Sequence, residues 1–435
     1  MRSLTLLLAL SAPYTALAAR LLALHDPTSP STSSGGFGGY FASLRDQGHD
    51  LDVATYEDGG RLLETRSADY YEGLIVFGSA AKQVPRSLTP QALARRIDQY
   101  GTSLVLAVPP DAAELWRDFA REFEVDFDDR GQVVVDYFSP PSPSSAPSDG
   151  TLFSVLLSSA PSPFVDDEAR AAPPVLYRGA GHLASRHPQL TPVLRAGSGA
   201  FSTDGGEGAA PPAPEEVRLA GSNVGLVSAF QARNNARVVF SGSADLFSEG
   251  LAVDADGNPT GNPAFLRSLS RWAFQQSGQL RVVSSAHENV ETGVEGGSTY
   301  RVGSELKYTL TLASTSPTPL ADIQLEFTML DPHVRLALTP ISSSPSSSSP
   351  GLTETTYEAT FRVPDRHGVF TLLVDYRRAG VQNVQDRHTI SVVPLRHNEY
   401  ERFITGAAPF YAGAVSVSVG FALFVVVWVL GAGSA

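Results

Sequence analysis

Two serines around a glycine, Ser241-Gly242-Ser243, are the residues of this sequence best placed to do chemistry, because they follow an apolar run typical of a buried strand. A serine on a sharp turn between a strand and a helix can act as a nucleophile when the pattern is G-x-S-x-G. Here Gly242 directly precedes Ser243, so the pattern fails, and helix capping by Ser243 or Asp245 is the favoured interpretation. Chemistry of the glutamine-amidotransferase type would need a cysteine, and the chain has none.

A glycine-rich run between a predicted strand and a predicted helix, SSGGFGGYF, could present backbone N–H groups to a phosphate. Gly36 and Gly38 begin a G-x-G-x-x-G pattern, but Phe41 stands where its third glycine would be, and no P-loop lysine follows. A flexible connection is therefore favoured over a phosphate site.

Two histidine patterns also fall short of a metal site. His287-Glu288 begins like a zincin motif, but Glu291 stands where the second histidine, one helical turn further on, would be. His182 and His187 are five residues apart, a spacing that does not place both imidazoles on one helix face, so structural or surface roles are favoured. We predict no catalytic residue, no cofactor and no metal site in this chain.

The composition is that of a globular protein: 42% of the 435 residues are hydrophobic and 18% are charged. At roughly 150 residues per domain, this length suggests about three units. The 45 acidic and 32 basic residues give a net charge of −13, which argues against nucleic-acid binding, since that needs clustered Lys and Arg. The lack of cysteine excludes disulfides, thiolate metal sites and a cysteine nucleophile.

The N-terminus has the features of a secretory signal peptide. A positive start, Met1-Arg2, precedes a short apolar run over 4–10 that is too short to span a membrane. Small residues at the positions read by signal peptidase follow it. We predict a signal peptide over 1–19, with cleavage after Ala18 or Ala19.

The C-terminal segment has the features of a membrane span. Residues 404–435 carry no charge, and their densest apolar part predicts a transmembrane helix over 410–430. Arg396 and Arg402 precede this helix and nothing basic follows it, which by the positive-inside rule would leave the body in the cytosol. The signal peptide outweighs this, because long domains cross largely regardless of charge, so we predict a single-pass type I protein with its body in the lumen. A lipid-anchor signal is the alternative.

Strand-like and helix-like segments alternate at short spacing through residues 20–138. The continuous apolar run 104–108 predicts a buried strand, whereas Leu93 and Ile97 lie one turn apart on a predicted helix. The last strand of this series is predicted over 133–138. Such alternation favours parallel strands with crossover helices, so we predict a doubly wound, flavodoxin-like α/β luminal region.

From about residue 280 the pattern changes to period two, as in 305–312, which predicts a small antiparallel β-sandwich between the α/β region and the membrane. The serine-rich run 342–349 is predicted to be a hairpin loop of this sandwich. The predicted division is a signal peptide (1–19), an α/β luminal domain (20–138), a Pro/Ser-rich linker (139–150), a second α/β segment (151–279), a β-sandwich domain (280–395), a juxtamembrane segment (396–409), a transmembrane helix (410–430) and a short tail (431–435).

The stretch FQARNNARVVFSGSADLFS at 230–248 resembles a signature of the oligosaccharyltransferase 48 kDa subunit family, whose yeast member is called Wbp. Further matches follow in the same order, among them YYEGLIVFG from Tyr70, LSRWAFQQSGQLRV from Leu269 and VPDRHGVFTLLVDYRRAG from Val363. On these blocks, which cover most of 43–430, the chain is identified as a member of that family. The signature residues are Asn234, Asn235, Arg237, Ser241, Gly242, Ser243 and Asp245.

The sequence departs from the family pattern mainly in predicted loops, at 197–199, at 205–214 and in the serine-rich run. It also stops without the short basic cytosolic tail that is common in the family. Retention is therefore expected to rest on assembly with partners, unless the sequence continues beyond its last residue.

The resemblance implies a place in the endoplasmic-reticulum complex that transfers a preassembled oligosaccharide from dolichyl diphosphate to asparagine in N-x-Ser/Thr sequons of nascent proteins. In that family, catalysis belongs to a separate multispanning subunit. This chain is therefore expected to be a non-catalytic scaffold of the endoplasmic-reticulum membrane. It would join the ribophorin-type subunits and the small DAD-type subunit to the catalytic one.

Two alternatives remain open. In the first, the chain is a luminal module of the complex that binds nascent polypeptide or glycan in the α/β cleft, near 179–182 or 241–245. In the second, it is an independent luminal hydrolase or transferase that uses Ser243 as its nucleophile.

Overall fold

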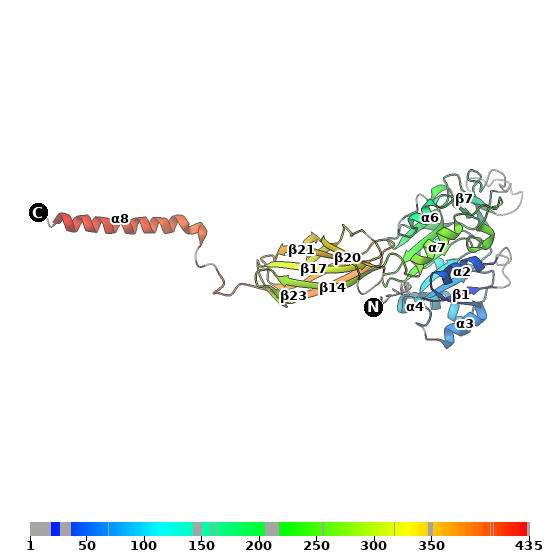
Figure 1. Cartoon of the computed structure of the whole chain (residues 1–435), viewed down its shortest axis with the longest axis horizontal. Coiled ribbons are helices and arrows are strands. Elements are labelled where there is room, and N and C mark those ends of the chain that lie inside the picture. The colour runs from blue at the N-terminus through cyan, green and yellow to red at the C-terminus, as the bar shows by residue number, and fades with distance from the viewer. Residues whose placement is uncertain are drawn as a thin grey trace, which may run out of the picture.

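Three bodies follow one another along the long axis of the computed structural model: an α/β body, a β-sandwich and a single long helix (Figure 1). The predicted order, with the sandwich between the α/β body and the C-terminal helix, is confirmed. The predicted signal peptide up to Ala18 lies outside the described residues. The structure describes residues 19–26, 36–67, 69–141, 150–157, 160–161, 163–204, 217–254, 256–316, 318–346, 351–400, 402 and 404–432.

In the described part of the α/β body, nine strands form one mixed sheet, and its parallel part has the order β2-β1-β3-β4-β13. These strands are short apolar runs, and β3, β4 and β13 are buried at every residue, as expected for strands covered on both faces. Their bounds are Arg20–His25 (β1), Asp50–Thr55 (β2), Gly73–Phe77 (β3), Ser103–Ala107 (β4) and Arg237–Ser241 (β13).

The sheet continues past β13 with antiparallel strands β12, β9 and β5, and β10 also pairs with β12. Because β13 pairs with β4, the segments 20–138 and 151–279 both contribute strands to this one sheet. The bounds of the antiparallel strands are Val125–Phe127 (β5), His182–Ala184 (β9), Leu190–Arg195 (β10) and Val224–Gln231 (β12).

Helices cover both faces of the sheet. Side chains of β1 alternate between two cores, with Leu21 and Ala23 in one and Leu22 and Leu24 in the other. The helices that contribute to the first core are α2 (Gly38–Asp46), α6 (Asp167–Ala171) and α7 (Asn262–Ala273), and those that contribute to the second are α3 (Tyr56–Thr65), α4 (Pro90–Tyr100) and α5 (Glu114–Arg121).

Local sequence explains where the helices begin and end. Thr55 caps α3, since its hydroxyl accepts the N–H of Asp58 at 3.3 Å. Helix α4 begins with Pro90 and ends at Gly101, which takes the left-handed conformation (φ +68°) that glycine adopts without strain. Leu93 and Ile97 of this helix are buried, as the sequence predicts.

Smaller elements surround the main sheet. Two pairs of short strands stand apart from it, β6 (Gln132–Val135) with β11 (Phe201–Asp204), and β7 (Phe153–Val155) with β8 (Val175–Tyr177). The described 3₁₀ helices are η1 (Arg86–Leu88), η3 (Gly221–Asn223), η4 (Asp245–Phe247), η5 (Glu249–Leu251) and η6 (Thr405–Ala407).

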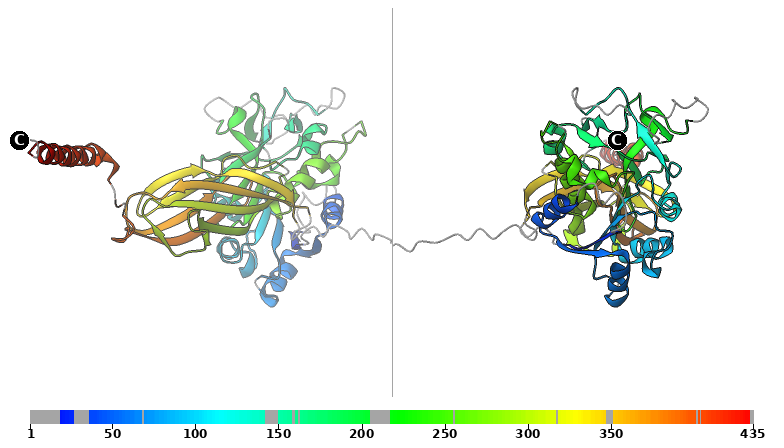
Figure 2. Two further views of the ribbon diagram at one scale, coloured as in Figure 1. Left: turned by 60° about the vertical axis from the view of Figure 1, so that its left-hand side comes forward. Right: turned by 90° about the vertical axis from the view of Figure 1, so that its right-hand side faces the viewer.

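The β-sandwich consists of two five-stranded sheets, ordered β15-β14-β17-β21-β20 and β16-β23-β22-β18-β19, that enclose one core. Alternate side chains of β17, from Leu306 to Leu312, are buried, which confirms the predicted period of two. The strands run along the long axis of the molecule (Figures 1 and 2). Their bounds are Leu280–Asn289 (β14), Val294–Glu295 (β15), Thr299–Arg301 (β16), Glu305–Ser314 (β17), Gln324–Thr328 (β18), Pro332–Ala337 (β19), Thr339–Pro345 (β20), Thr353–Arg362 (β21), Gly368–Tyr376 (β22) and Val384–Val393 (β23).

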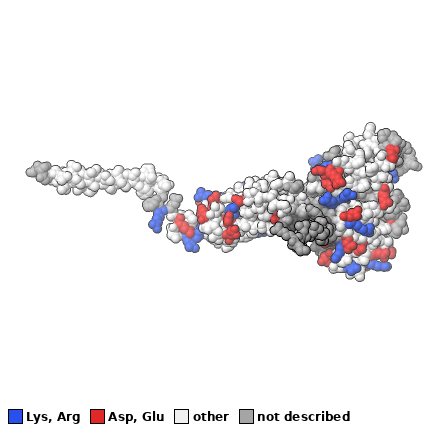
Figure 3. All heavy atoms as spheres, viewed as in Figure 1, with Lys and Arg blue, Asp and Glu red and all other residues white. Residues whose placement is uncertain are grey.

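Helix α8 (Ala408–Ala432) stands apart from the rest of the molecule and is exposed along its whole length (Figures 1 and 2). It contains no charged residue, as its uniform white surface in Figure 3 shows. Together with η6 it makes a span of 28 residues, which is long and apolar enough to cross a membrane. The predicted span 410–430 lies within it.

Candidate functional site

The turn after β13 lies at the carboxyl edge of the parallel strands, where open α/β sheets bind their ligands. Ser243 lies here and is almost fully buried. Its hydroxyl donates to the carbonyl of Arg178 and accepts the N–H of Leu246 at 3.0 Å, which caps η4. The Ser241 hydroxyl donates to the carbonyl of Ser243 at 3.1 Å. Both hydroxyls therefore bond main-chain atoms, and the capping interpretation of Ser243 is confirmed.

Gly242 brings two backbone segments into direct contact. The N–H of Ala180 donates to the Gly242 carbonyl at 2.8 Å. A Cβ atom on Gly242 would lie 1.9 Å from the carbonyl oxygen of Ala180, and one on Gly179 would lie 2.4 Å from the oxygen of Gly242. The two glycines are therefore required for packing, because a side chain at either position would collide with the facing backbone.

His182 is fully buried beside this turn. Its Nε2 atom hydrogen-bonds the hydroxyl of Ser228 at 2.7 Å, and its ring lies 5.0 Å from that of Phe127. Burial lowers the pKa of His182 to about 3, so the imidazole is neutral at pH 7. His187 is only partly buried and stacks on Phe230, so the structural and surface roles predicted for the two histidines are confirmed.

Acidification should therefore destabilise the α/β body through His182. Its pKa is about 3 in the folded state and about 6.5 when unfolded, so between these values the unfolded chain binds more protons and stability falls as the pH falls. At pH 5 this amounts to about 2 kcal/mol relative to pH 7. Urea unfolding at pH 5 and at pH 7 measures this difference in the free energy of unfolding. The variant His182→Gln should show a smaller difference between the two pH values. Equal pH dependence in the two proteins would contradict the assignment.

The first signature residues lie where the α/β body meets the sandwich. Asn234 donates to the carbonyls of Ile97 and Asp98, at 2.7 and 2.9 Å, and so fastens the β12–β13 turn to the end of α4. Asn235 accepts the N–H of Asn383 at 2.7 Å and donates to the carbonyl of the same residue at 3.1 Å. Asn383 precedes β23 of the sandwich, so Asn235 joins the two bodies by a pair of hydrogen bonds.

Arg237 is the charged centre of this junction. Its buried guanidinium donates to the carbonyls of Trp272, Ser277 and Gly278, at 2.6, 2.7 and 3.0 Å, and lies 4.9 Å from the Trp272 ring. These carbonyls belong to the end of α7 and to the segment that leads to β14. Those of Trp272 and Gly278 also accept the N–H groups of Gln275 and Gln382, at 3.0 and 2.8 Å. Burial lowers the pKa of Arg237 to about 9, so the group is still charged at pH 7.

Residues 377–383, which we call the junction loop, complete the contact from the sandwich side. The Trp272 indole N–H donates to the Gly380 carbonyl at 2.8 Å, and the Gln231 amide donates to the Val381 carbonyl at 2.7 Å. A Cβ atom on Gly278 would lie 2.2 Å from the Gly380 oxygen, so the two backbones touch. The junction is therefore closely packed and hydrogen-bonded on both sides.

An open pocket of about 300 Å³ lies beside the junction loop. Arg377 and Arg378 on its rim are paired with Asp375 and Asp322, at 2.7 and 2.6 Å, whereas Arg233 is exposed. The pocket therefore offers aromatic, amide and guanidinium groups together. Its lining residues are Phe164, His187, Pro188, Gln189, Thr191, Ala229, Gln231, Arg233, Arg377, Arg378, Ala379, Gly380 and Asn383.

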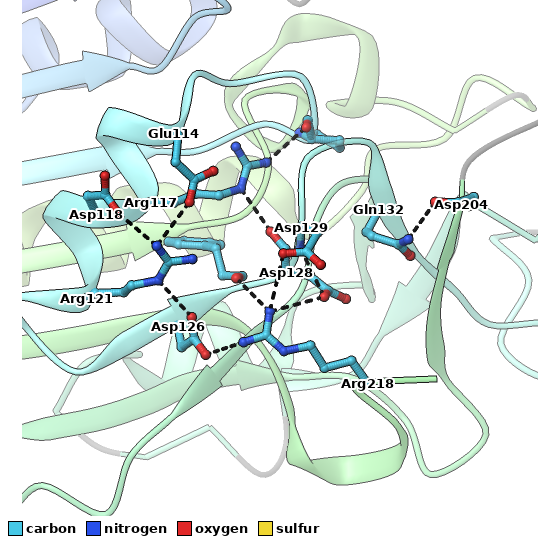
Figure 4. Close-up of polar contacts among 12 residues, drawn as sticks. Glu114, Arg117, Asp118, Arg121, Asp126, Asp128, Asp129, Gln132, Asp204 and Arg218 are labelled. Atoms are coloured by element: carbon cyan, nitrogen blue, oxygen red, sulfur yellow. Dashed lines mark hydrogen bonds and ion pairs between the residues drawn. The ribbon is translucent and has the colours of Figure 1, made fainter. Parts of the chain in front are cut away.

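A second polar cluster, around α5 and β5, combines acidic residues with three arginines (Figure 4). Arg121 pairs with Glu114, Asp118 and Asp126, and Arg218 pairs with Asp126 and with the nearly buried Asp128 at 3.6 Å. These pairs hold Arg218 against β5 and the residues that follow it. Sequence reasoning missed this cluster, because Arg218 and Asp126 lie far apart in the chain.

Comparison with known proteins now identifies the chain. A family model described as the OST48 N-terminal domain matches residues 14–276, and one described as the OST48 middle domain matches residues 286–432. This protein belongs to the OST48 family. The two matches together cover most of the α/β body, the sandwich and α8.

Curated relatives agree with this OST48 assignment. The chain is 33% identical over 422 residues to the dolichyl-diphosphooligosaccharide–protein glycosyltransferase 48 kDa subunit of Arabidopsis thaliana, covering 93% of this chain and 91% of that protein. It is 30% identical to the glycosyltransferase subunit wbp1 of Schizosaccharomyces pombe, covering 91% and 89% of the two chains. The 48 kDa subunit of Drosophila melanogaster is 31% identical, with 88% and 86% covered.

Proposed function

We propose that the chain is a non-catalytic, structurally required subunit of the endoplasmic-reticulum oligosaccharyltransferase, which transfers a preassembled oligosaccharide from dolichyl diphosphate to asparagine of N-x-Ser/Thr sequons. The observation that carries the proposal is the match to named subunits of this glycosyltransferase along nearly the whole chain. The site geometry supports the non-catalytic part, since the hydroxyls of Ser241 and Ser243 serve as main-chain partners.

We infer a type I topology with the body in the lumen of the endoplasmic reticulum and α8 in its membrane. The exposed, uncharged α8 supports this. Ala19 is buried, and its N–H faces Nδ1 of His49 at 3.3 Å. A signal peptide that is cleaved after Ala18 would leave this residue as the first of the mature chain.

We infer that the parallel half of the sheet is a doubly wound, flavodoxin-like unit. The order β2-β1-β3-β4-β13, with helices on both faces, supports this assignment. We also propose that the chain divides as the sequence predicts, into 1–19, 20–138, 139–150, 151–279, 280–395, 396–409, 410–430 and 431–435.

The role proposed for the fold is that of a stiff support. The signature residues Asn235 and Arg237 hold the α/β body on the sandwich, and the sandwich connects to α8. A body held at a fixed height above a membrane can bind partner subunits at fixed positions. The proposed partners are the multispanning catalytic subunit, the ribophorin-type subunits and the small DAD-type subunit.

Ser243→Ala separates this proposal from that of an independent enzyme. The variant loses a cap, which costs about 1 kcal/mol, but should keep the complex and its activity. The tagged chain is purified from its own membranes in mild detergent, its partners are identified by mass spectrometry, and glycosylation of an acceptor peptide is measured. An intact complex without activity would give Ser243 a catalytic role and reject the proposal.

The pocket beside the junction loop supports a second candidate, a module that binds nascent polypeptide or glycan. Aromatic, amide and guanidinium groups together suit hydrogen bonding and stacking with either ligand. Arg233→Ala should then alter the preference among acceptor peptides while the complex stays intact. An unchanged preference among acceptor peptides would reject the binding role and leave structural support as the proposed function.

A further inference from the structure

One end of the sandwich faces α8, and we call it the outer end (Figure 1). Strand β14 starts next to the α/β body, and β23 starts at the junction loop, so both run toward the outer end. The loops there are those after β14 (290–293), between β18 and β19 (329–331) and before β22 (363–367). The outer end is therefore assembled from segments that are distant in the sequence.

These loops and their borders expose aliphatic side chains. Leu330 is 94% exposed and Val369 is 58% exposed, and they belong to neighbouring segments, since a Cβ atom on Gly368 would lie 2.9 Å from the sulfur of Met329. Val290 and Val294 are exposed after β14. Clustered exposed apolar side chains of this kind mark interaction surfaces.

Three polar contacts hold the juxtamembrane chain against the outer end. The carboxylate of Glu399 pairs with the guanidinium of Arg301 on β16 at 3.2 Å and accepts the N–H of Arg396 at 2.8 Å. Arg301 also donates to the carbonyl of Pro394 at 3.3 Å. The chain is thus fastened to the sandwich as far as Glu399.

Only five residues separate Glu399 from Thr405, where the 28-residue apolar span begins. Fully extended, this stretch reaches about 20 Å at most. With α8 in a membrane, the outer end is therefore held within about 20 Å of the level where the span enters the bilayer. The membrane is the surface that this tether brings to the exposed aliphatic residues.

We propose that the outer end rests on the luminal face of the membrane, with Met329, Leu330 and Val369 in the headgroup layer. This rests on the proposed membrane anchorage by α8. Acidic and basic side chains lie side by side at this end (Figure 3), and Asp331 belongs to the loop between β18 and β19. Mixed charge suits zwitterionic lipid, so phosphatidylcholine is the lipid surface assigned here.

The lack of cysteine gives a clean test. Single cysteines replace Leu330 and Val369, and Phe424 in α8 and the exposed Val53 on β2 serve as controls. Each full-length variant is labelled with the polarity-sensitive dye NBD and reconstituted into phosphatidylcholine vesicles with or without nitroxide-labelled lipid. We expect emission to fall about twofold at residues 330, 369 and 424 and to stay unchanged at residue 53.

The outcomes separate the proposal from its premise. Quenching at residue 424, with water-like emission at 330 and 369, would show that α8 lies in the membrane but that the outer end does not touch it. This result would overturn the proposed lipid contact. Blue-shifted but unquenched emission at 330 would mean that protein rather than lipid covers the outer end, which also overturns the proposal. No quenching at 424 would remove α8 from the membrane, and the proposed anchorage would fall with the contact.

Discussion

Replacing Arg237 by alanine should lower the free energy of unfolding by about 3–5 kcal/mol, because it removes a fully buried guanidinium that donates to three main-chain carbonyls. The affected carbonyls belong to Trp272, Ser277 and Gly278, which connect the α/β body to the sandwich. The melting temperature of the full-length chain in detergent should fall by about 10 °C. In membranes, less of the variant should be recovered with its partner subunits.

Arg233→Ala is the matched control for this loss. Arg233 lies in the same β12–β13 segment and is exposed, so its removal should change stability by less than about 0.5 kcal/mol. Arg237→Lys keeps the charge but has no planar fork for three carbonyls, so it should rescue only part of the stability. Equal melting temperatures for Arg237→Ala and Arg233→Ala would refute the role given to the buried guanidinium.

Replacing Gly242 by alanine should destabilise the α/β body by about 3 kcal/mol. The new methyl carbon would lie 1.9 Å from the Ala180 oxygen and 2.8 Å from the Tyr177 hydroxyl, so one backbone segment must move. Thermal unfolding and expression yield measure the effect. It should exceed that of Ser243→Ala in the same turn, which removes only a cap.

The control for Gly242 is Gly39→Ala in α2. A methyl carbon there meets its nearest atom, in the flexible side chain of Glu249, at 3.5 Å. Because alanine favours a helix over glycine, this variant should be unchanged or stabilised by up to about 1 kcal/mol. If Gly242→Ala had the same melting temperature as the wild type, the turn would accommodate a methyl group, and the packing role given to Gly242 would be wrong.

The best-predicted elements are those whose own residues determine their burial. The apolar run 104–108 gives β4 at the expected position, and α4 buries Leu93 and Ile97 as predicted. The period of two in β17 predicts its buried face, and the uncharged C-terminal segment forms α8. In each case the pattern of side chains within one segment is sufficient to predict the type of the element and which of its residues are buried.

Elements whose place depends on remote partners were predicted less well. The strand predicted over 133–138 is the last of the α/β series. In the structure, β6 lies outside the main sheet and pairs with β11, from another part of the chain. Part of the serine-rich run expected as a loop lies in β20, which pairs with β21. All residues of β20 are exposed, so its sequence has no apolar alternation that would indicate a strand, although the hydroxyls of Ser343 and Thr355 bond across the pair at 2.7 Å.

The role of the signature was also hidden from sequence reasoning. Asn235 and Arg237 are visible as polar residues around a strand, but their partners lie as far away as Asn383, on the junction loop. Only the folded chain brings these groups together. The cap at Ser243 could be predicted, because its partner Leu246 is three residues away.

The junction and the Glu399 contacts join the α/β body, the sandwich and the chain before α8 into one lever. The junction loop lets the α/β body move only together with the sandwich, and the tether places the pivot at the outer end, close to the membrane. A small tilt at this pivot is magnified along the long axis of the molecule. A partner subunit that bound the α/β body would therefore set the angle of the whole rod and, with α8 anchored as proposed, the tilt of α8 in the bilayer.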